Sequence, residues 1–242
     1  MLERKGNKMT RKDVLRIVDH TLLKPNATVK DIQSLIDDAI KYNTYSVCIP
    51  PSFVRTARDY VMRMSAYADI NQRVKICTVI GFPNGYNTTE AKAYEAQDAI
   101  LNGADEIDMV IDIGALKEKN YAYLERQIQV IAAICHDIKR EHEQVVLKVI
   151  IETCLLDESE IREMCRICHV SGADYIKTST GFSSGGATFK DIQIMRDEIV
   201  KIGSRLKIKA AGGIATFEDA AKMIKYGADR LGTSRLVQLM KG

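Results

Sequence analysis

Hydrophobic and polar positions in this chain follow two alternating periods, which predict strands and helices in turn. Segments with a period of two, rich in β-branched residues, predict eight strands: Ile17–Thr21, Ser46–Ile49, Val74–Ile80, Glu106–Asp112, Val145–Glu152, Tyr175–Thr180, Leu206–Ala211 and Arg230–Thr233. Stretches with a helical period lie between most of them, and predict helices at Thr28–Tyr42, Thr88–Asn102, from Asp157 onward, Phe189–Ile202 and Phe217–Tyr226. The residues before the first strand predict an N-terminal helical extension.

Glycine turns mark where the predicted helices end. The sequence Gly-Ala-Asp occurs at Gly103, Gly172 and Gly227, each time between a helix and a strand, and Gly203 lies similarly before Leu206. Glycine suits the left-handed position that ends a helix. Eight strand–helix units in 242 residues predict a single (β/α)8 TIM barrel spanning residues 1–242 as one domain. The alternative is an open doubly wound sheet, but no early strand–GxGxxG–helix supports it.

Strand alternation predicts an unusual barrel interior. It places five charged residues on the inward faces: Asp19, Asp108, Lys148, Lys177 and Lys209. A structural barrel interior is filled with branched apolar residues, and unpaired buried charges are costly. Two plainer explanations are a solvated Lys177 on an edge strand and a self-compensating ion network without function. Charges of both signs from five strands favour an active site.

The two lysines suggest a reaction type. A lysine attacks a carbonyl only as the neutral amine, and its free pKa of about 10.4 makes that form scarce at neutral pH. Burial and a neighbouring cation lower this pKa. Lys177 and Lys209 lie one strand–helix unit apart, so we expect one to be the nucleophile and the other the perturbing cation. With Asp108 as a proton carrier, they predict Schiff-base carbon–carbon bond chemistry without a metal or cofactor.

Glycine-rich turns follow the last three predicted strands. They contain Gly181, Gly212-Gly213 and Gly232-Thr233-Ser234. TIM barrels often bind phosphate at the loops after their last strands, through backbone N–H groups. A lone Gly-Gly pair is often only a tight turn. Three such turns at successive strand ends favour a phosphorylated substrate.

Composition excludes several classes of function. Hydrophobic residues make up 46% and charged residues 28% of the chain, as in soluble globular proteins. The net charge of +3 comes from interspersed residues without a basic stripe, so we expect no nucleic-acid partner. The N-terminus lacks the apolar core of a signal peptide, and no apolar run is long enough to span a membrane. We therefore expect a cytoplasmic protein whose six cysteines are reduced thiols.

Several motifs that resemble haem, metal or reactive-thiol sites have a structural explanation. Cys165–His169 matches the C-x-x-C-H haem-attachment pattern, but Ile161, Met164 and the two cysteines share one helix face, which predicts packing. The four histidines show no metal-binding spacing. We expect Cys48 to be a small buried hydrophobe rather than a reactive thiol.

The chain resembles the deoxyribose-phosphate aldolase family from about Asp19 to Ser234. The stretches that carry the resemblance are VDHTLLKP, SVCIPPSFV, VIGFPNGYNTTEAKAYEA, GADEIDMVIDIGALK, LKVIIETCLL, GADYIKTSTGFSSGGAT, IKAAGGIATFEDA and RLGTSR. The resemblance implies a class I aldolase that reversibly cleaves 2-deoxy-D-ribose 5-phosphate, in deoxyribose phosphate catabolism, to D-glyceraldehyde 3-phosphate and acetaldehyde. It places the Schiff-base lysine at Lys177, the second lysine at Lys209 and the proton-transfer aspartate at Asp108.

The resemblance also implies a substrate site and partners. Its substrate-binding and phosphate-binding residues fall on Asp19, Cys48, Lys148, Thr178, Gly181, Gly212, Gly213 and Ser234. The implied partners are small sugar phosphates and aldehydes, with no cofactor, no metal, no membrane and a homo-oligomeric state of two or four subunits.

Some positions depart from the family pattern. Asp112 replaces an asparagine common in relatives, and we expect it to add a carboxylate near the site. Phe182 stands where some relatives have lysine. Arg235 replaces a second serine, and we expect it to supply positive charge to the phosphate. Some relatives carry a C-terminal tyrosine that assists proton transfer, whereas no tyrosine follows Tyr226 here.

Two other functions fit the same residues. One is another Schiff-base aldolase or a transaldolase-like barrel that acts on a different sugar phosphate. The other is a non-catalytic barrel that binds sugar phosphates, which leaves the grouping of Lys177, Lys209 and Asp108 unexplained.

Overall fold

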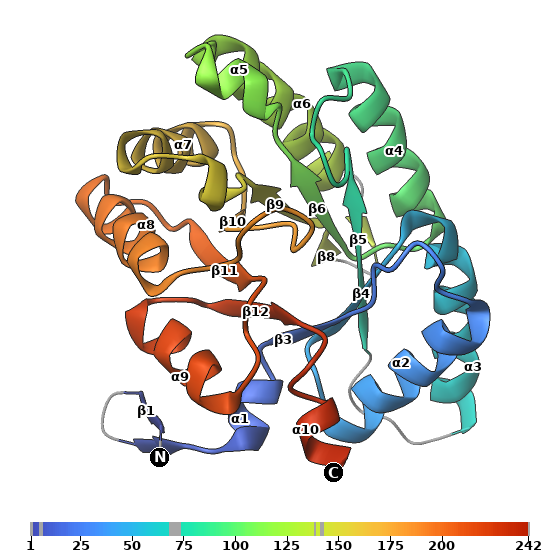
Figure 1. The fold of residues 1–242 in the computed structure, drawn as a ribbon. Coiled ribbons are helices and arrows are strands. Elements are labelled where there is room, and N and C mark those ends of the chain that lie inside the picture. Colours follow the sequence, from blue (N-terminus) through green and yellow to red (C-terminus); the bar gives the residue numbers. More distant parts are fainter. Residues whose placement is uncertain (1, 5–6, 68–73, 138, 141–142, 242) are drawn as a thin grey trace.

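A closed barrel of eight parallel strands lies at the centre of the molecule, with helices around it (Figure 1). The structure is a computed structural model that describes residues 2–4, 7–67, 74–137, 139–140 and 143–241. The barrel strands are β3 (Val18–Thr21), β4 (Ser46–Ile49), β5 (Lys75–Ile80), β6 (Glu106–Val110), β9 (Val146–Ile150), β10 (Tyr175–Lys177), β11 (Lys207–Ala211) and β12 (Arg230–Thr233). Each predicted strand is present and the (β/α)8 prediction is confirmed, although β6, β9 and β10 end earlier than predicted.

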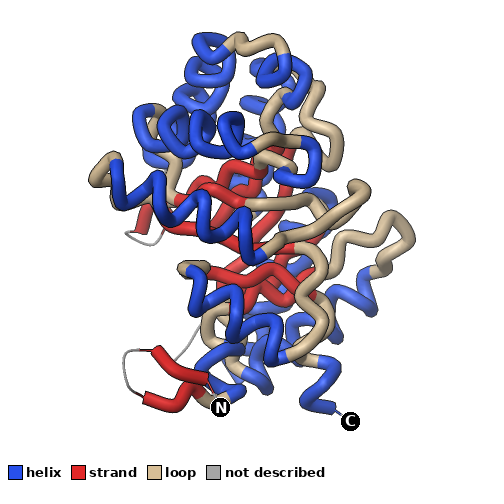
Figure 2. The backbone as a smooth tube through the Cα atoms, turned by 60° about the vertical axis from the view of Figure 1, so that its left-hand side comes forward, coloured by secondary structure: helices blue, strands red, loops and turns tan. Residues whose placement is uncertain are grey.

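The helices cover the outside of the barrel (Figure 2). The longer ones are α2 (Val29–Tyr42), α3 (Val54–Tyr67), α4 (Thr89–Asn102), α6 (Tyr121–Asp137), α7 (Glu158–Val170), α8 (Phe189–Lys201) and α9 (Phe217–Tyr226). Shorter elements are α1 (Arg11–Leu15), α5 (Ile113–Lys117), α10 (Gln238–Lys241) and the 3-10 turns η1 (Pro51–Phe53) and η2 (Thr153–Leu155). All five helices expected from the hydrophobic pattern are present. The pattern does not single out α3 and α6, which bury polar side chains such as Arg58 and Gln127.

The N-terminal extension is mainly a hairpin. β1 (Leu2–Arg4) pairs antiparallel with β2 (Asn7–Met9), so the predicted helical extension is confined to α1. A second small hairpin joins β7 (Lys139–Arg140) and β8 (Glu143–Gln144). Among the described residues, no helix is both long enough and apolar enough to cross a membrane.

The three Gly-Ala-Asp turns act as repeated structural units. α4 and α9 end at Gly103 and Gly227, both with φ of +117°, as the pattern predicts. The aspartate of each turn accepts a hydrogen bond from a backbone N–H of the neighbouring strand: Ile76 to Asp105 at 2.7 Å, Leu147 to Asp174 at 2.8 Å and Ile208 to Asp229 at 2.9 Å. These bonds fix the register of adjacent strands. The register in turn sets the position of each inward side chain along the barrel axis.

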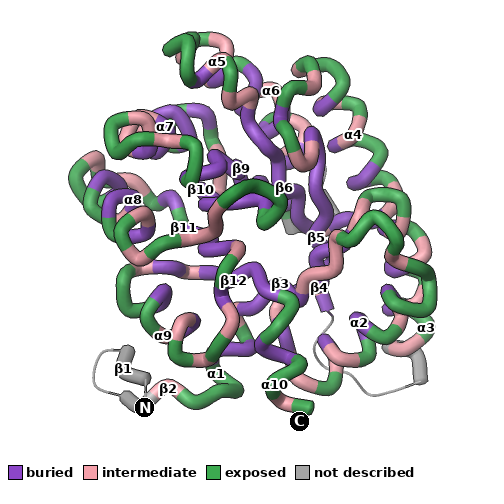
Figure 3. Tube along the Cα trace, viewed as in Figure 1, coloured by how far each residue is buried: buried purple, intermediate pink, exposed green. Residues whose placement is uncertain are grey.

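The apolar core lies between the barrel and the helices, where Figure 3 shows the buried strands inside partly exposed helices. In α7 the residues Ile161, Met164, Cys165 and Cys168 are buried, which confirms the packing role predicted for this stripe. The barrel interior instead holds charged side chains, which form the centre of the candidate site.

Candidate active site

Three lysines surround Asp108 inside the barrel. Lys177 on β10 is the register partner of Lys209 on β11, and Asp108 on β6 is that of Lys148 on β9. The Nζ atoms of Lys177 and Lys209 both donate to Oδ2 of Asp108 at 2.7 Å, and Lys148 donates to Oδ1 at 2.8 Å. All four side chains are buried. The structure thus brings together the five inward residues predicted from strand alternation, since Asp19 pairs with Lys209.

A second layer of charge lies beside this cluster. Arg230 on β12 donates to Oδ1 of Asp19 at 2.8 Å and to Oε2 of Glu106 at 3.2 Å, while Lys148 lies 2.7 Å from Glu106. The guanidinium of Arg230 also stacks 3.4 Å from the ring centre of Tyr45. Glu106 and Arg230 are not among the site residues predicted from the sequence. Glu106 lies two residues before Asp108, so the same alternation predicts that it points inward.

The network favours the charged forms of Asp108, Lys148 and Lys209. Burial alone would raise the pKa of Asp108, but Lys148, Lys177 and Lys209 together hold it well below the usual value. Burial would lower the pKa of Lys148 and of Lys209, but Asp108 and other acidic neighbours raise both. These carboxylates favour the ammonium form of Lys209.

Two thiols lie next to the charged cluster. Cys77 on β5 is the register partner of Cys48 on β4, and its Sγ lies 3.3 Å from both Asp108 Oδ1 and Lys148 Nζ. Hydrogen bonding from Cys77 lowers the pKa of Cys48, whereas burial raises that of Cys77. Cys48 is only 1% exposed and packs with Cys77, as expected for a small buried hydrophobe.

Thiol and carboxylate groups in the described residues approach the spacing of a metal site. Ligand atoms of Cys48, Cys77 and Asp108 lie within 4.8 Å of one another, as do those of Asp19, Cys77 and Glu106. However, the carboxylates of Asp108 and Glu106 already pair with lysine and arginine side chains. This positive charge disfavours a metal cation.

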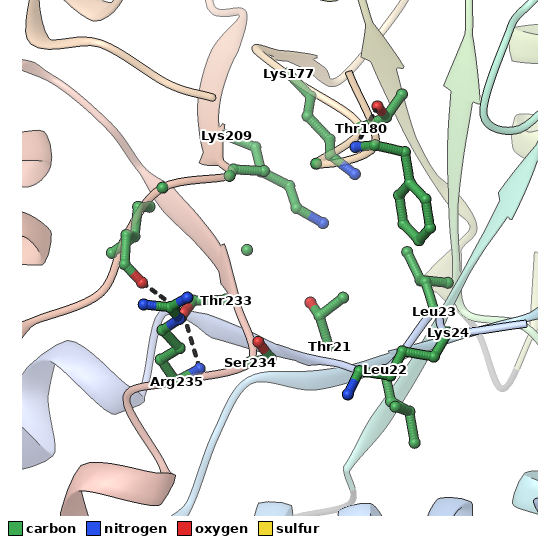
Figure 4. Close-up of a pocket in the computed structure, with 17 residues that line it drawn as sticks. Thr21, Leu22, Leu23, Lys24, Lys177, Thr180, Lys209, Thr233, Ser234 and Arg235 are labelled. Carbon is green, nitrogen blue, oxygen red and sulfur yellow. Dashed lines mark hydrogen bonds between the residues drawn. The ribbon is translucent and has the colours of Figure 1, made fainter. Parts of the chain in front are cut away.

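A pocket of about 390 Å³ lies above the charged network, at the carboxyl ends of the strands (Figure 4). The predicted residues that line it are Lys177, Lys209, Gly181, Gly212, Gly213, Ser234 and Arg235. Residues outside the prediction also line it, among them Thr21, Leu23, Thr180 and Phe182. Thr21 follows Asp19 by two positions, so strand alternation also predicts its direction.

Other predicted residues lie outside the pocket lining. Asp19, Asp108 and Lys148 belong to the network beneath it. The hydroxyl of Thr178 bonds to the backbone of Ala211, where it extends the sheet. Asp112 accepts a hydrogen bond from the N–H of Ala115 and caps α5, rather than adding a carboxylate to the charged cluster.

One end of the pocket is built for an anion. Gly212 and Gly213 have φ of +80° and +77°, and among the described residues their N–H groups donate to no protein acceptor. A Cβ on Gly212 would lie 3.0 Å from Cα of Gly186, so this turn requires glycine. The exposed Arg235 lies beside them in the same lining. Successive free N–H groups in such turns form an anion-binding concavity.

Comparison with known proteins identifies the family. Residues 14–235 match the model of the DeoC/LacD family aldolases. The chain is 51% identical over 230 residues to a deoxyribose-phosphate aldolase of Streptococcus agalactiae, covering 95% of each protein. The chain belongs to the DeoC/LacD aldolase family. A deoxyribose-phosphate aldolase of Streptococcus pyogenes is 50% identical, again over 95% of both chains.

Solved structures described as deoxyribose-phosphate aldolases have the same fold. A putative deoxyribose-phosphate aldolase from Coccidioides immitis is 34% identical with a TM-score of 0.87, covering 97% of this chain and 88% of that one. The deoxyribose phosphate aldolase from Aeropyrum pernix, described as a unique tetrameric structure, is 27% identical with a TM-score of 0.83, covering 96% and 93%. This DeoC/LacD aldolase therefore shares its whole barrel with them.

Proposed function

We propose that this chain is a deoxyribose-phosphate aldolase that reversibly cleaves 2-deoxy-D-ribose 5-phosphate to D-glyceraldehyde 3-phosphate and acetaldehyde. The observation that carries the proposal is the position of Lys177. Its amine contacts Asp108 at the floor of a pocket whose opposite wall presents free N–H groups. The amine is thus placed to meet a carbonyl, and the free N–H groups are placed to bind a phosphate on the same substrate.

The charge balance of the network supports Lys177 as the nucleophile. In the described interior, Lys148, Lys177, Lys209 and Arg230 face only three carboxylates, those of Asp19, Glu106 and Asp108. When all are ionised, one positive charge is in excess. Lys148 and Lys209 are each held by two carboxylates, whereas Lys177 contacts Asp108 alone and lines the pocket, where its amine can meet a bound carbonyl.

The reaction follows from these groups. The Lys177 amine adds to C1 of the open-chain sugar, and loss of water gives an iminium ion. The C3 hydroxyl then loses its proton, the C2–C3 bond breaks and D-glyceraldehyde 3-phosphate leaves. The electron pair forms an enamine on Lys177, which is protonated at C2 and hydrolysed to acetaldehyde. Asp108 contacts the reacting nitrogen and accepts and returns its proton during the addition and dehydration steps.

The anion end of the pocket positions the substrate. We assign the phosphate to the N–H groups of Gly212, Gly213 and Ser234, with charge from Arg235. Gly181, with φ of +83°, opens the third loop of this wall. Lys209 stays protonated between Asp19 and Asp108, where it keeps a positive charge near the reacting centre.

The wider setting of the enzyme is also part of the proposal. We infer one domain over residues 1–242, since β3 and β12 pair and join the two ends of the barrel. We infer that the enzyme is cytoplasmic and acts on small-molecule substrates. The interspersed basic and acidic residues support the absence of a nucleic-acid partner. The tetramer described for a structural relative supports a homo-oligomer. Light scattering on the purified chain tests the oligomeric state.

Borohydride trapping tests the chemistry. The chain is incubated with acetaldehyde and reduced, and the modified peptide is located by mass spectrometry in the wild type and in Lys177→Leu. A two-carbon adduct on Lys177, absent from the variant, is expected together with turnover of 2-deoxyribose 5-phosphate. Turnover of ribose or fructose phosphates instead would favour another aldolase. Ligand binding without an adduct would favour the sugar-phosphate-binding barrel.

A further inference from the structure

A buried carboxylate that the proposed mechanism does not use lies just after β9. Glu152 is only 2% exposed, and no lysine or arginine of the described residues pairs with it. Its partner is Thr180, in the loop after β10. The Thr180 hydroxyl donates to Oε2 of Glu152 at 2.5 Å, and the Thr180 N–H donates to both carboxylate oxygens at 3.3 Å. Burying a carboxylate without a cation is costly, so a structural role alone would not favour glutamate here.

The backbone of Glu152 is also unusual. It has φ of +55° and ψ of +65°, the left-handed region that glycine adopts easily and other residues rarely adopt. The N–H of Ile151 donates to the oxygen of Lys177 at 3.0 Å, which holds one side of this residue. The N–H of Thr153 donates to the oxygen of Thr178 at 2.9 Å, which holds the other side. Strain of this kind concentrates at functional sites, and glycine would relieve it here only by removing the carboxylate.

Thr180 connects this carboxylate to the pocket. It lines the pocket together with Lys177 and Gly181, whereas Glu152 lies behind the lining (Figure 4). The Thr180 hydroxyl gives its single hydrogen to Glu152 and accepts from the N–H of Phe182 at 3.0 Å. Gly181 therefore lies between two residues whose N–H groups are held. Its own N–H donates to no acceptor in the part of the protein that the structure describes.

The contact requires an acceptor at both carboxyl oxygens, because Thr180 presents two donors to Glu152. A carboxylate accepts through both oxygens, whereas a glutamine would turn a donating NH₂ group toward one of those donors. We propose that Glu152 is a positioning residue that holds the segment from Thr180 to Phe182 in the shape that binds the phosphate end of the substrate. The inference rests on the function proposed above, which supplies the phosphorylated sugar as substrate. Addition of Lys177 to a carbonyl does not depend on this contact.

Steady-state kinetics with 2-deoxyribose 5-phosphate test the inference. The variants are Glu152→Gln, Glu152→Gly, Thr180→Val, Thr180→Ser and the double variant Glu152→Gln/Thr180→Val. Glu152→Gly removes the carboxylate but suits the left-handed backbone, so this variant should fold even if the others do not. Glu90→Gln is the matched control, because Glu90 is exposed on α4 and lies outside the pocket lining.

Glu152→Gln and Glu152→Gly should each raise KM about tenfold, with kcat within about threefold, because the phosphate-binding wall loses its shape. Formation of the acetaldehyde adduct on Lys177 should stay within about twofold of the wild-type rate, since this small donor does not reach the wall. Thr180→Ser keeps the hydroxyl and should keep KM within about twofold of the wild type. The double variant should lose no more than Thr180→Val alone, because Glu152 acts through Thr180.

Two outcomes of these kinetics would overturn the inference. One is a wild-type KM in both Glu152 variants. The other is a double variant in which the two single losses add, because Glu152 would then act independently of Thr180. Loss of the acetaldehyde adduct in step with sugar phosphate cleavage would also count against it, because general damage to the fold lowers both.

Hydrogen exchange separates this inference from the proposed function, because it needs no substrate. Exchange in the peptide that contains Thr180 and Phe182 is followed by mass spectrometry and should be at least about fivefold faster in Glu152→Gly than in the wild type. Faster exchange in a chain that does not cleave 2-deoxyribose 5-phosphate supports the contact and refutes the proposed function. Normal cleavage with unchanged exchange and KM in Glu152→Gly refutes the positioning role alone.

Discussion

Lys177 and Lys209 occupy the same register on adjacent strands and donate to the same oxygen of Asp108, each at 2.7 Å. One carboxylate oxygen thus offsets the repulsion between two buried ammonium groups. It also gives the two lysines a shared proton acceptor.

Replacing Asp108 by Asn should reduce kcat for cleavage of 2-deoxyribose 5-phosphate by about 10²- to 10⁴-fold, the usual contribution of a positioned proton-transfer group. The Lys177 adduct with acetaldehyde should still form, but more slowly. Asp112→Asn is the matched control, since Asp112 caps α5 and asparagine is an equally good cap. A kcat for Asp108→Asn within about threefold of the wild type would exclude a proton-transfer role.

Lys148→Met should lower the free energy of unfolding by about 3–5 kcal/mol, because it leaves the buried carboxylates of Glu106 and Asp108 short of a partner. Urea denaturation measures the loss. The exposed Lys30 on α2 provides the control variant Lys30→Met, which should change stability by less than about 0.5 kcal/mol. Equal effects in the two variants would show that the interior network does not require Lys148.

Lys92 should make stability depend on pH in mildly alkaline solution. It is fully buried on α4, where Nζ donates to the backbone oxygen of Gly85 at 2.6 Å and to Gln127 Oε1 at 2.9 Å. Burial lowers its pKa to about 8, against the opposing effect of Asp112 and Glu95. The unfolded chain, with a lysine pKa of about 10.4, therefore binds more protons than the folded chain between these values.

Stability from Lys92 consequently rises with pH through this window, by about 2 kcal/mol at pH 9.5 relative to pH 7. Urea denaturation at the two pH values should show this rise in the wild type and in Lys30→Met. The rise should be smaller by that amount in Lys92→Met. The same pH dependence in Lys92→Met as in the wild type would show that this lysine does not change its protonation in the window.

Arg235→Ala should raise KM for 2-deoxyribose 5-phosphate about tenfold with little change in kcat, because a charged hydrogen bond to the phosphate is lost. Unphosphorylated 2-deoxyribose should be cleaved with unchanged kcat/KM. The exposed Arg55 on α3 supplies the control variant Arg55→Ala. A KM for the phosphorylated sugar that does not change would exclude Arg235 from the phosphate site.

The period of the sequence was sufficient to predict the barrel and the direction of its inward side chains. Alternation within a strand is local, so Asp108, Lys148, Lys177 and Lys209 could be placed inside without knowledge of their partners. The glycine turns could be predicted as well, since a left-handed residue at a helix end is a local requirement. The buried stripe of α7 followed from helical spacing alone.

Distances between strands far apart in the chain were decided only by the tertiary structure. Arg230 reaches Glu106 across 124 positions of sequence, and Phe82 meets Phe182 only because the barrel closes. Burial of Lys92 and the capping role of Asp112 likewise depend on how loops pack onto helices. Sequence patterns record which face a residue prefers, whereas charge pairing and pocket shape depend on which strands become neighbours when the barrel closes.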